Sequence, residues 1–229
     1  MTDHVSPDQI VLRSWSLDHE RLASAPAEAL LSAEERARGA RFATAELRRR
    51  FVAGRAGLRR ALGEHLGVDP RALVFAENAH GKPRLVGART VHFSLSHSGD
   101  RAVVALSDTL EVGADLERIR PIEHLELARR YFHRSECAVI EALAGEEAQR
   151  RAFFLIWTLK EAIVKSLGQG LSIALDSFAV SIEAARLRLV VCPAGAAMDW
   201  WLDVAEEAGY CRALAAPAAG AVGLIQRTL

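Results

Sequence analysis

Three carboxylates and a lysine, in two separate stretches, have the types and spacing of a metal-assisted phosphate site. Asp115 and Glu117 are two residues apart in a short stretch that is bounded by turn residues, so we interpret it as a strand with both carboxylates on one face. Glu161 and Lys165 are four residues apart in 157–165, which lacks Gly and Pro and predicts a helix. Carboxylate oxygens suit a hard divalent cation, and a lysine one turn away can contact a phosphate oxygen.

Each stretch also has a common explanation without function. A Glu and a Lys four residues apart usually form a solvated surface pair, and Asp-x-Glu also occurs on solvent-facing strands. The prediction therefore depends on both stretches occurring in one chain. If they meet, Asp115, Glu117 and Glu161 can hold Mg²⁺, or Mn²⁺ in its place, and such a cation can grip a pyrophosphate.

Basic residues elsewhere could hold a second phosphate group. Only three lysines occur in a chain that otherwise uses arginine, namely Lys82, Lys160 and Lys165, and a compact ammonium suits a phosphate contact. Taken singly, such residues are more often surface or core-edge residues. The candidates for this second phosphate are Arg38, Arg55, Lys82 and His97.

Composition excludes several classes of protein. The chain has 229 residues, half of them apolar, and a net charge of zero, so bulk charge gives no reason to expect nucleic-acid binding. No apolar run approaches the ~20 residues of a membrane span, and the N-terminus lacks the pattern of a signal peptide. Three dispersed cysteines, Cys137, Cys192 and Cys211, are typical of reduced thiols. We therefore expect a cytoplasmic protein.

Several common enzyme motifs are absent from the sequence. There is no Gly-x-x-x-x-Gly-Lys-Ser/Thr loop, so an ordinary nucleotide triphosphatase is not expected. No Gly-x-Gly-x-x-Gly follows a predicted strand, so a dinucleotide-binding fold is not expected. No Gly-x-Ser-x-Gly elbow occurs, which argues against an α/β hydrolase.

The elements that must position these residues follow from hydrophobic periodicity and from caps such as Ser32 and Glu35. The expected strands are 9–17, 71–75, 84–86, 91–96, 101–106, 111–117, 172–182, 186–192, 200–204, 210–216 and 222–225. The expected helices are 32–42, 44–66, 125–132, 135–143 and 146–167. Residues 97–100 are expected to form a turn. This order predicts an α+β protein of two halves, 1–110 and 111–229.

Three stretches resemble, in order and spacing, the motifs of the 4'-phosphopantetheinyl transferases. They are Phe93-Ser94-Leu95-Ser96-His97-Ser98-Gly99, Val112-Gly113-Ala114-Asp115-Leu116-Glu117 and Trp157-Thr158-Leu159-Lys160-Glu161-Ala162-Ile163-Val164-Lys165. The chain length and an upstream Gly81-Lys82-Pro83 resemble the larger branch of the family, which activates polyketide and non-ribosomal peptide synthetases. The likeness spans about 31–175.

The resemblance implies a monomer of two similar α+β halves related by a pseudo-two-fold axis, with coenzyme A in the cleft between them. It implies transfer of the phosphopantetheine arm to a serine of an apo acyl- or peptidyl-carrier domain, releasing adenosine 3',5'-bisphosphate. The first half would take the 3'-phosphate and adenine side of coenzyme A, and the second half would carry the metal and the catalytic groups.

The resemblance also implies roles for the site residues. Asp115, Glu117 and Glu161 would hold Mg²⁺, Glu161 would also deprotonate the carrier serine, and Lys165 would stabilise the phosphate. The catalytic residues are therefore Glu161, Lys165 and Asp115. Coenzyme A would contact Arg38, Arg55, Lys82, Pro83, Ser96, His97, Lys160 and Lys165.

The chain departs from the family at Glu35 and Phe51, where a basic and a small hydroxyl residue are expected. Arginines such as Arg36, Arg38 and Arg55 are therefore expected to hold the 3'-phosphate. Carrier docking is expected at 118–135, through Ile119, Ile122, Leu125 and Leu127.

Two alternatives use the same residues. A magnesium-dependent coenzyme A pyrophosphate hydrolase would need similar carboxylates, but it would normally cluster them on one helix. A non-catalytic module that binds coenzyme A or a carrier is the other alternative, and the intact set of Asp115, Glu117, Glu161 and Lys165 argues against it.

Overall fold

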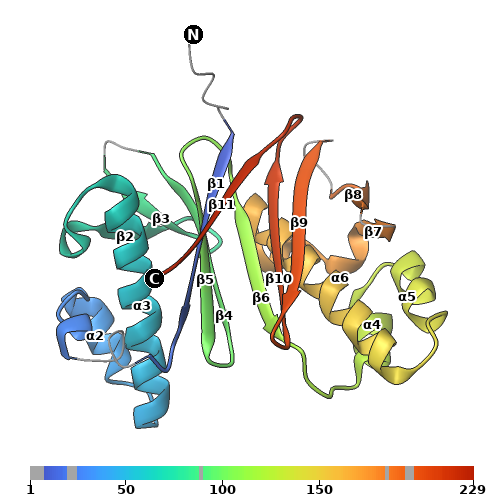
Figure 1. Ribbon diagram of the computed structural model, residues 1–229, viewed down its shortest axis with the longest axis horizontal. Helices are drawn as coiled ribbons and strands as arrows, with labels where there is room; N and C mark the ends of the chain where they lie inside the picture. Colours follow the sequence, from blue (N-terminus) through green and yellow to red (C-terminus); the bar gives the residue numbers. More distant parts are fainter. Residues whose placement is uncertain (1–7, 20–24, 88–89, 184–185, 194–198) are drawn as a thin grey trace.

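Two helix-and-strand halves lie side by side in the computed structural model, with their sheets in the middle and their long helices outside (Figure 1). The structure describes residues 8–19, 25–87, 90–183, 186–193 and 199–229. Met1–His4, from which we expect no signal peptide, lie outside the described residues.

In the described residues, each half contains a strand, three α-helices, one or two short 3-10 helices, a two-stranded hairpin and two further strands. The first half comprises β1 (Gln9–Ser16), α1 (Ala25–Glu28), α2 (Ala33–Gly39), α3 (Ala45–Leu66), the short 3-10 helix η1 (Pro70–Ala72), β2 (Val74–Glu77), β3 (Pro83–Val86), β4 (His92–Ser98) and β5 (Arg101–Ser107). The second comprises β6 (Gly113–Arg118), α4 (His124–Tyr131), α5 (Arg134–Glu141), α6 (Glu146–Leu167), η2 (Gly170–Ser172), η3 (Leu175–Ser177), β7 (Ala179–Glu183), β8 (Arg186–Val191), β9 (Trp200–Glu207) and β10 (Tyr210–Pro217). The last strand is β11 (Gly223–Thr228).

The two halves also share their sheet topology. The strand order β1-β5-β4 in the first sheet corresponds to β6-β10-β9 in the second, and both sets pair antiparallel. The helices α3 and α6 have 22 residues each and occupy equivalent places in the chain. The prediction of an α+β fold with two similar halves is confirmed.

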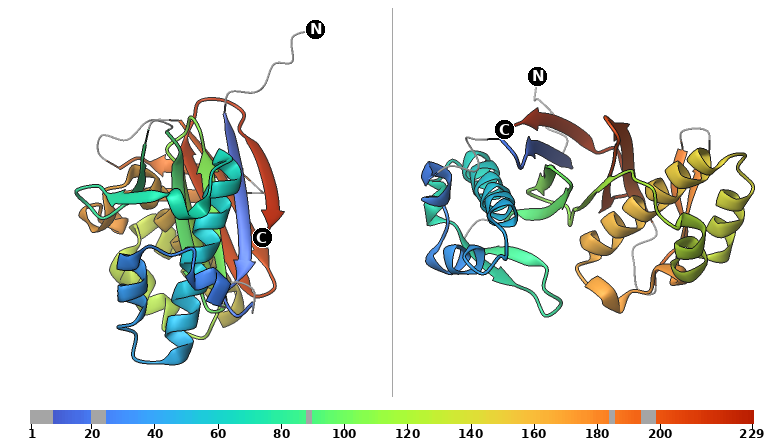
Figure 2. Two further views of the ribbon diagram at one scale, coloured as in Figure 1. Left: turned by 90° about the vertical axis from the view of Figure 1, so that its left-hand side faces the viewer. Right: turned by 90° about the horizontal axis from the view of Figure 1, so that it is seen from below.

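The C-terminal strand crosses the predicted boundary between 110 and 111. β11 pairs in parallel with β1, from Gln9 opposite Gly223 to Ser14 opposite Thr228. It thus extends the sheet of the first half to the order β11-β1-β5-β4, and Figure 2 shows the two strands running side by side. This strand therefore ties the end of the chain to its beginning.

Three apolar cores hold the molecule together. One lies between α3 and the first sheet, around Leu58 and Phe93, and a second lies between α6 and the second sheet, around Leu159 and Ile163. A third core joins the facing sides of the two sheets and includes Ile10, Val103, Ala114 and Leu214. Burial of these side chains drives the association of the halves. Among the described residues no helix has the length and apolar character needed to cross a membrane.

The structure differs from the predicted elements in three places near the site. The first part of the expected strand 172–182 is not a strand, because η2 and η3 precede β7, which begins only at Ala179. β4 continues through Ser98, so His97 lies in a strand and the turn is confined to Gly99 and Asp100. Residues 70–72 form η1, because Pro70 begins this helix and the Asp69 side chain caps it by accepting from the Arg71 amide.

Candidate active site

The carboxylates of β6 reach α6 because a glycine lets the strand approach the helix backbone. A Cβ at Gly113 would lie 1.8 Å from the Ala162 carbonyl oxygen and 2.5 Å from the Ser166 nitrogen. Asp115 and Glu117 follow Gly113 at intervals of two and share its face of the strand. Any larger residue at 113 would push this face away from the helix turn that carries Glu161 and Lys165.

Asp115 forms the centre of the polar cluster. Its side chain is 5 % exposed, and Oδ1 accepts hydrogen bonds from Lys165 Nζ at 2.5 Å and from Ser96 Oγ at 2.8 Å. Lys165 Nζ also lies 3.1 Å from Ser96 Oγ. The predicted meeting of the strand and helix motifs is confirmed by these contacts.

Alternate serines of β4 join the two sheets at this point. The hydroxyls of Ser94, Ser96 and Ser98 accept hydrogen bonds from the backbone amides of residues 114, 116 and 118 at 3.0, 3.2 and 3.0 Å. Ser96 and Ser98 then donate to the carboxylates of Asp115 and Glu117 at 2.8 and 2.9 Å. The serines thus replace a backbone ladder between β4 and β6 and also orient two carboxylates.

Burial and mutual repulsion make Glu161 a stronger base than an ordinary glutamate. Burial raises its pKa, and the Asp115 carboxylate raises it further, while Lys165 opposes both and Glu117 adds a smaller repulsion. Burial also raises the pKa of Glu117, although the hydrogen bond from Ser98 lowers it. A carboxylate whose pKa is shifted toward neutrality is suited to accept a proton in catalysis.

Two observations fit a divalent cation among these carboxylates. Asp115 Oδ2 is buried without a hydrogen-bond partner in the described part of the chain. The Asp115 carboxylate raises the pKa of both Glu161 and Glu117, and these hard oxygens are a donor set that a cation would stabilise. Among the described residues no three His, Cys, Asp or Glu side chains already converge closely enough to hold an ion, so the metal assignment stays a prediction.

A cavity of about 780 Å³ opens beside this cluster, between the two halves. Glu161 and Lys165 contribute to its wall from the second half, and Lys82 and Pro83 contribute from the β2–β3 turn of the first half. Its volume is that of a cofactor-sized pocket. The wall residues that sequence reasoning gave no role are His80, Phe93, Leu95, Arg130, Tyr131, Trp157, Ile173, Ala174, Leu175 and Asp176.

Lys82 lies in this wall, but its ammonium already has partners in the protein. Nζ donates to Glu111 Oε2 at 2.7 Å and to the Ser166 carbonyl oxygen at 3.0 Å. Glu111 also pairs with His92 Nδ1 at 3.0 Å. Lys82 therefore connects the hairpin of the first half to α6 of the second.

The prediction that Lys160 contacts coenzyme A is wrong in this structure. Its side chain is fully buried, and Nζ donates to both oxygens of Glu136, at 2.7 and 2.6 Å, and to the Phe178 carbonyl oxygen at 2.6 Å. Lys160 and Glu161 are adjacent on α6 and so point in directions about 100° apart. Of these two residues, Glu161 lines the cavity and Lys160 does not.

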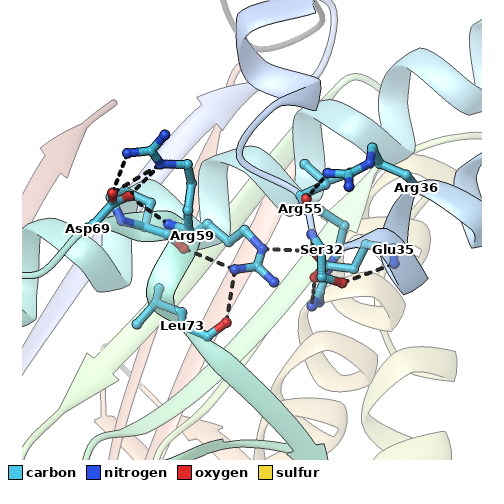
Figure 3. Close-up of polar contacts among 10 residues, drawn as sticks. Ser32, Glu35, Arg36, Arg55, Arg59, Asp69 and Leu73 are labelled. Carbon is cyan, nitrogen blue, oxygen red and sulfur yellow. Dashed lines mark hydrogen bonds and ion pairs between the residues drawn. The ribbon is translucent and has the colours of Figure 1, made fainter.

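The expected arginine grip on a phosphate is also wrong for Arg55, whose guanidinium is held by Glu35. Figure 3 shows Arg55 and Arg59 converging on Glu35, with Arg59 Nε 2.7 Å from Glu35 Oε2 and Arg55 Nε 2.7 Å from Oε1. Arg36 instead donates to the Leu31 carbonyl. Glu35 thus pairs with two arginines of α3 that are 20 and 24 residues away in the sequence.

Arg38 and His97 lie outside the residues that line the cavity. Arg38 is exposed and lies over the Phe51 ring at 5.8 Å. Partial desolvation, followed by the charge of Lys165, lowers the pKa of His97. Ser96 is buried, and its hydroxyl bonds to Asp115, Lys165 and the backbone, so it orients the cluster.

Two kinds of residue in the site were not identified from the sequence. Gly113 was visible in the strand motif, but only the packing of β6 on α6 shows why no side chain fits there. The residues after α6, such as Ile173 and Leu175, lie in and between two short 3-10 helices without periodicity, and only the fold brings them beside Trp157.

The chain is similar to known proteins over both halves. Residues 111–215 match the 4'-phosphopantetheinyl transferase superfamily, and residues 13–109 match the N-terminal region described as 4'-phosphopantetheinyl transferase, N-terminal. The 4'-phosphopantetheinyl transferase HetI of Nostoc sp. is 40% identical over 170 residues, which are 72% of this chain and 71% of that protein. The 4'-phosphopantetheinyl transferase Sfp of Bacillus subtilis is 33% identical over 153 residues, 67% of each chain.

A solved structure, the holo-[acyl-carrier-protein] synthase of Thermotoga maritima, matches with 18% identity and a TM-score of 0.40, covering 47% of this chain and 63% of that one. Matches of this length extend over parts of both halves. By this similarity, the chain belongs to the 4'-phosphopantetheinyl transferase superfamily.

Proposed function

We propose that this protein transfers the 4'-phosphopantetheine arm of coenzyme A to a serine of an apo acyl- or peptidyl-carrier domain. The single observation that carries the proposal is the cluster of Asp115, Glu117, Glu161 and Lys165 at the wall of a cavity between the halves. The cavity can take an elongated ligand, and the cluster is suited to its phosphates.

The reaction forms one bond and breaks another at a single phosphorus. The serine oxygen attacks the phosphorus that carries the pantetheine arm, and the bond from this phosphorus to the bridging oxygen of adenosine 3',5'-bisphosphate breaks. Glu161 accepts the serine proton, for which its raised pKa suits it. The products are holo carrier and adenosine 3',5'-bisphosphate.

The remaining charged residues stabilise and orient the phosphates. Asp115, Glu117 and Glu161 are the residues that would hold Mg²⁺ or Mn²⁺, which when bound supplies charge neutralisation at the pyrophosphate. Lys165 lies one helical turn from Glu161 and can donate to a phosphate oxygen near the leaving group. Ser96 holds Asp115, and Ser98 holds Glu117, so both carboxylates keep a fixed direction.

The cavity supports a place for the rest of coenzyme A. Pro83 and the turn before it form the wall on the side of the first half, and apolar side chains such as Tyr131 and Trp157 form the wall on the other side. We place the nucleotide toward the first half, near Lys82 and His97. The pantetheine arm then lies toward the second half.

The surface around 118–135 is the proposed docking site for the carrier. The apolar residues expected there, Ile119, Ile122, Leu125 and Leu127, are partly buried against the second-half core, so they support the site from beneath. The exposed residues of this region include Arg118, Arg120 and Arg130. Their charge favours a carrier surface that presents acidic side chains. We propose that the protein works as a monomer in the cytoplasm.

The test is intact-protein mass spectrometry of an apo carrier domain incubated with this protein, coenzyme A and Mg²⁺. A gain of about 340 Da on the carrier, abolished by chelation of the metal, is expected for metal-assisted transfer. Loss of coenzyme A without that gain, for several carrier types, would contradict the transferase and support a pyrophosphate hydrolase. Binding of coenzyme A without either change would support a non-catalytic module.

A further inference from the structure

The turn between β2 and β3 is tied to the end of α6, although these segments belong to opposite halves. Asn78 Nδ2 donates to the Gly168 carbonyl oxygen at 2.8 Å, beside the bond from Lys82 to Ser166. Gly168 caps α6 with φ of 65°, and a Cβ there would lie 2.9 Å from Lys82 Cδ. Figure 2 shows the hairpin projecting from the first half toward the second.

The two ends of the Asn78 amide have separate tasks. Oδ1 accepts from the backbone amides of His80 and Lys82 at 2.8 and 2.9 Å, which folds the turn. Nδ2 points outward to the carbonyl at the end of α6. One side chain therefore shapes the turn and fastens it to the other half.

This contact lies where two walls of the cavity meet. His80, Gly81, Lys82 and Pro83 line the cavity from the turn, and Gly168 and the residues after it line the cavity from the end of α6. Asn78 itself is not among the lining residues. It can therefore influence a ligand only by setting the position of these walls.

The base of the hairpin is also held by hydrogen bonds. Arg59, which is 2 % exposed, donates to the carbonyl oxygens of Pro70 and Leu73 at 2.9 and 3.0 Å, just before β2 begins. Glu35 in turn holds Arg59. Because the base is fixed to α3 and α2, the position of the tip against α6 depends on the contacts of Asn78 and Lys82.

We propose that Asn78 is a positioning residue for coenzyme A, whose amide fastens the β2–β3 turn to the end of α6 and thereby keeps the two cavity walls at binding distance. The proposal rests on the proposed function, because it takes coenzyme A as the ligand of this cavity. Without the contact, binding must itself order the hairpin, and that cost lowers affinity.

The variant Asn78→Asp separates the two tasks. Aspartate has the same shape and keeps the acceptor for the two turn amides, but it has no N–H for Gly168 and places a negative charge at the negative end of α6. We expect the Kd for coenzyme A, measured by calorimetry, and its KM to rise about 3- to 10-fold, with kcat within twofold. Glu77→Gln, on the neighbouring exposed residue, is the control and should change neither constant.

Hydrogen exchange provides a second measurement that needs no ligand. In Asn78→Asp, amides of 78–83 and 166–170 should exchange faster than in the wild-type protein, while the core of α3 should be unchanged. Asn78→Ala, which loses both tasks, should show a larger effect in 78–83. Asn78 lies on an exposed turn, so both variants are expected to fold.

Two results would overturn the proposal. Values of Kd and KM within twofold of the wild type, together with unchanged exchange in both segments, would show that the contact does not hold the walls. A fall in kcat at constant KM would place Asn78 in the chemical step. If the wild-type protein does not bind coenzyme A, the proposed function fails, and hydrogen exchange still decides whether Asn78 holds the two segments together.

Discussion

Burial divides the charged residues of this chain into two groups. Lys160 and Arg59 are enclosed, and they donate hydrogen bonds to carboxylate and carbonyl groups of the protein, so their charges stabilise the fold. Glu161 and Lys165 reach the cavity and keep access to a ligand. Neighbouring positions on one helix thus carry different tasks, and the direction of each side chain decides which.

Replacing Glu161, the proposed base, tests the role of a single residue most directly. Glu161→Gln keeps the size of the side chain but cannot accept a proton, so kcat for carrier modification should fall by about 10²- to 10⁴-fold. The measurement is the initial rate of holo-carrier formation. Glu147→Gln, on the exposed first turn of the same helix, is the matched control and should retain the wild-type rate. A normal rate in Glu161→Gln would remove Glu161 from the role of base.

Lys160 is predicted to be a stability residue. Lys160→Met leaves the buried Glu136 carboxylate without its cation, and removing one partner of such a pair costs about 3–5 kcal/mol of unfolding free energy. The double variant Lys160→Met, Glu136→Gln removes the stranded charge and should be more stable than the single variant. Urea denaturation of both gives the comparison, and a loss below about 1 kcal/mol in the single variant would contradict the expectation.

At the scale of elements, the helices of the first half are joined through one acid. Glu35 closes the capping box of α2 with Ser32 and also accepts from Arg55 and Arg59 of α3 (Figure 3). Burial alone would raise the pKa of Glu35, but the hydrogen bond from Arg59 and the charge of Arg55 outweigh it and hold the pKa below its usual 4.5. The ionised form therefore stabilises the folded state.

The lowered pKa of Glu35 determines how the stability of the protein depends on pH. Because the pKa of Glu35 is lower in the folded than in the unfolded state, its stabilising contribution is present above pH 4.5 and is lost as pH falls through the folded-state pKa. Glu35→Gln should therefore lose about 3 kcal/mol at pH 7, where buried Arg59 loses its partner charge.

The measurement is urea denaturation of both proteins from pH 7 to pH 3. The gap between wild type and Glu35→Gln should narrow below pH 4.5. Glu34→Gln, the exposed neighbour, is the control and should show neither effect. A gap that stays constant down to pH 3 would contradict the role of the ionised carboxylate.

At the scale of the whole molecule, side-chain hydroxyls connect the halves. The serines of β4 bind the backbone amides of β6 in place of carbonyl groups, while the apolar sides of the two sheets meet in a shared core. The polar side of the same junction holds the carboxylates. The same contacts between β4 and β6 therefore join the halves and position the carboxylates.

The cost of removing a serine should follow its burial. Ser94→Ala leaves the buried amide of residue 114 unpaired and should cost about 1–3 kcal/mol of unfolding free energy, whereas at the half-buried Ser98 water can replace part of the lost bond. Urea denaturation of Ser94→Ala and Ser98→Ala measures which variant loses more unfolding free energy. Equal losses would show that the hydroxyls do not act as the connecting ladder.

Local pattern was enough to predict the carboxylate site. The strand with Asp115 and Glu117, and the helix turn with Glu161 and Lys165, have periodicities that any fold must respect, and their side chains meet as expected. The capping box at Ser32 was equally local and is present. These features depend on neighbours within a few residues.

Other assignments failed because they depend on distant contacts. The sequence could not show that Glu35 takes Arg55, or that Lys160 turns inward to Glu136, since these partners are 20 and 24 residues apart. The pairing of β11 with β1 likewise joins opposite ends of the chain.

By itself, then, the sequence determined the α+β class of this transferase and the strand and helix positions of Asp115, Glu117 and Glu161, because strand and helix periods place side chains by local geometry. Only the tertiary structure decided which cations remain free for a ligand and how the hairpin closes on α6. A buried charge takes the nearest opposite charge in space, and proximity in space is set by the packing of whole elements.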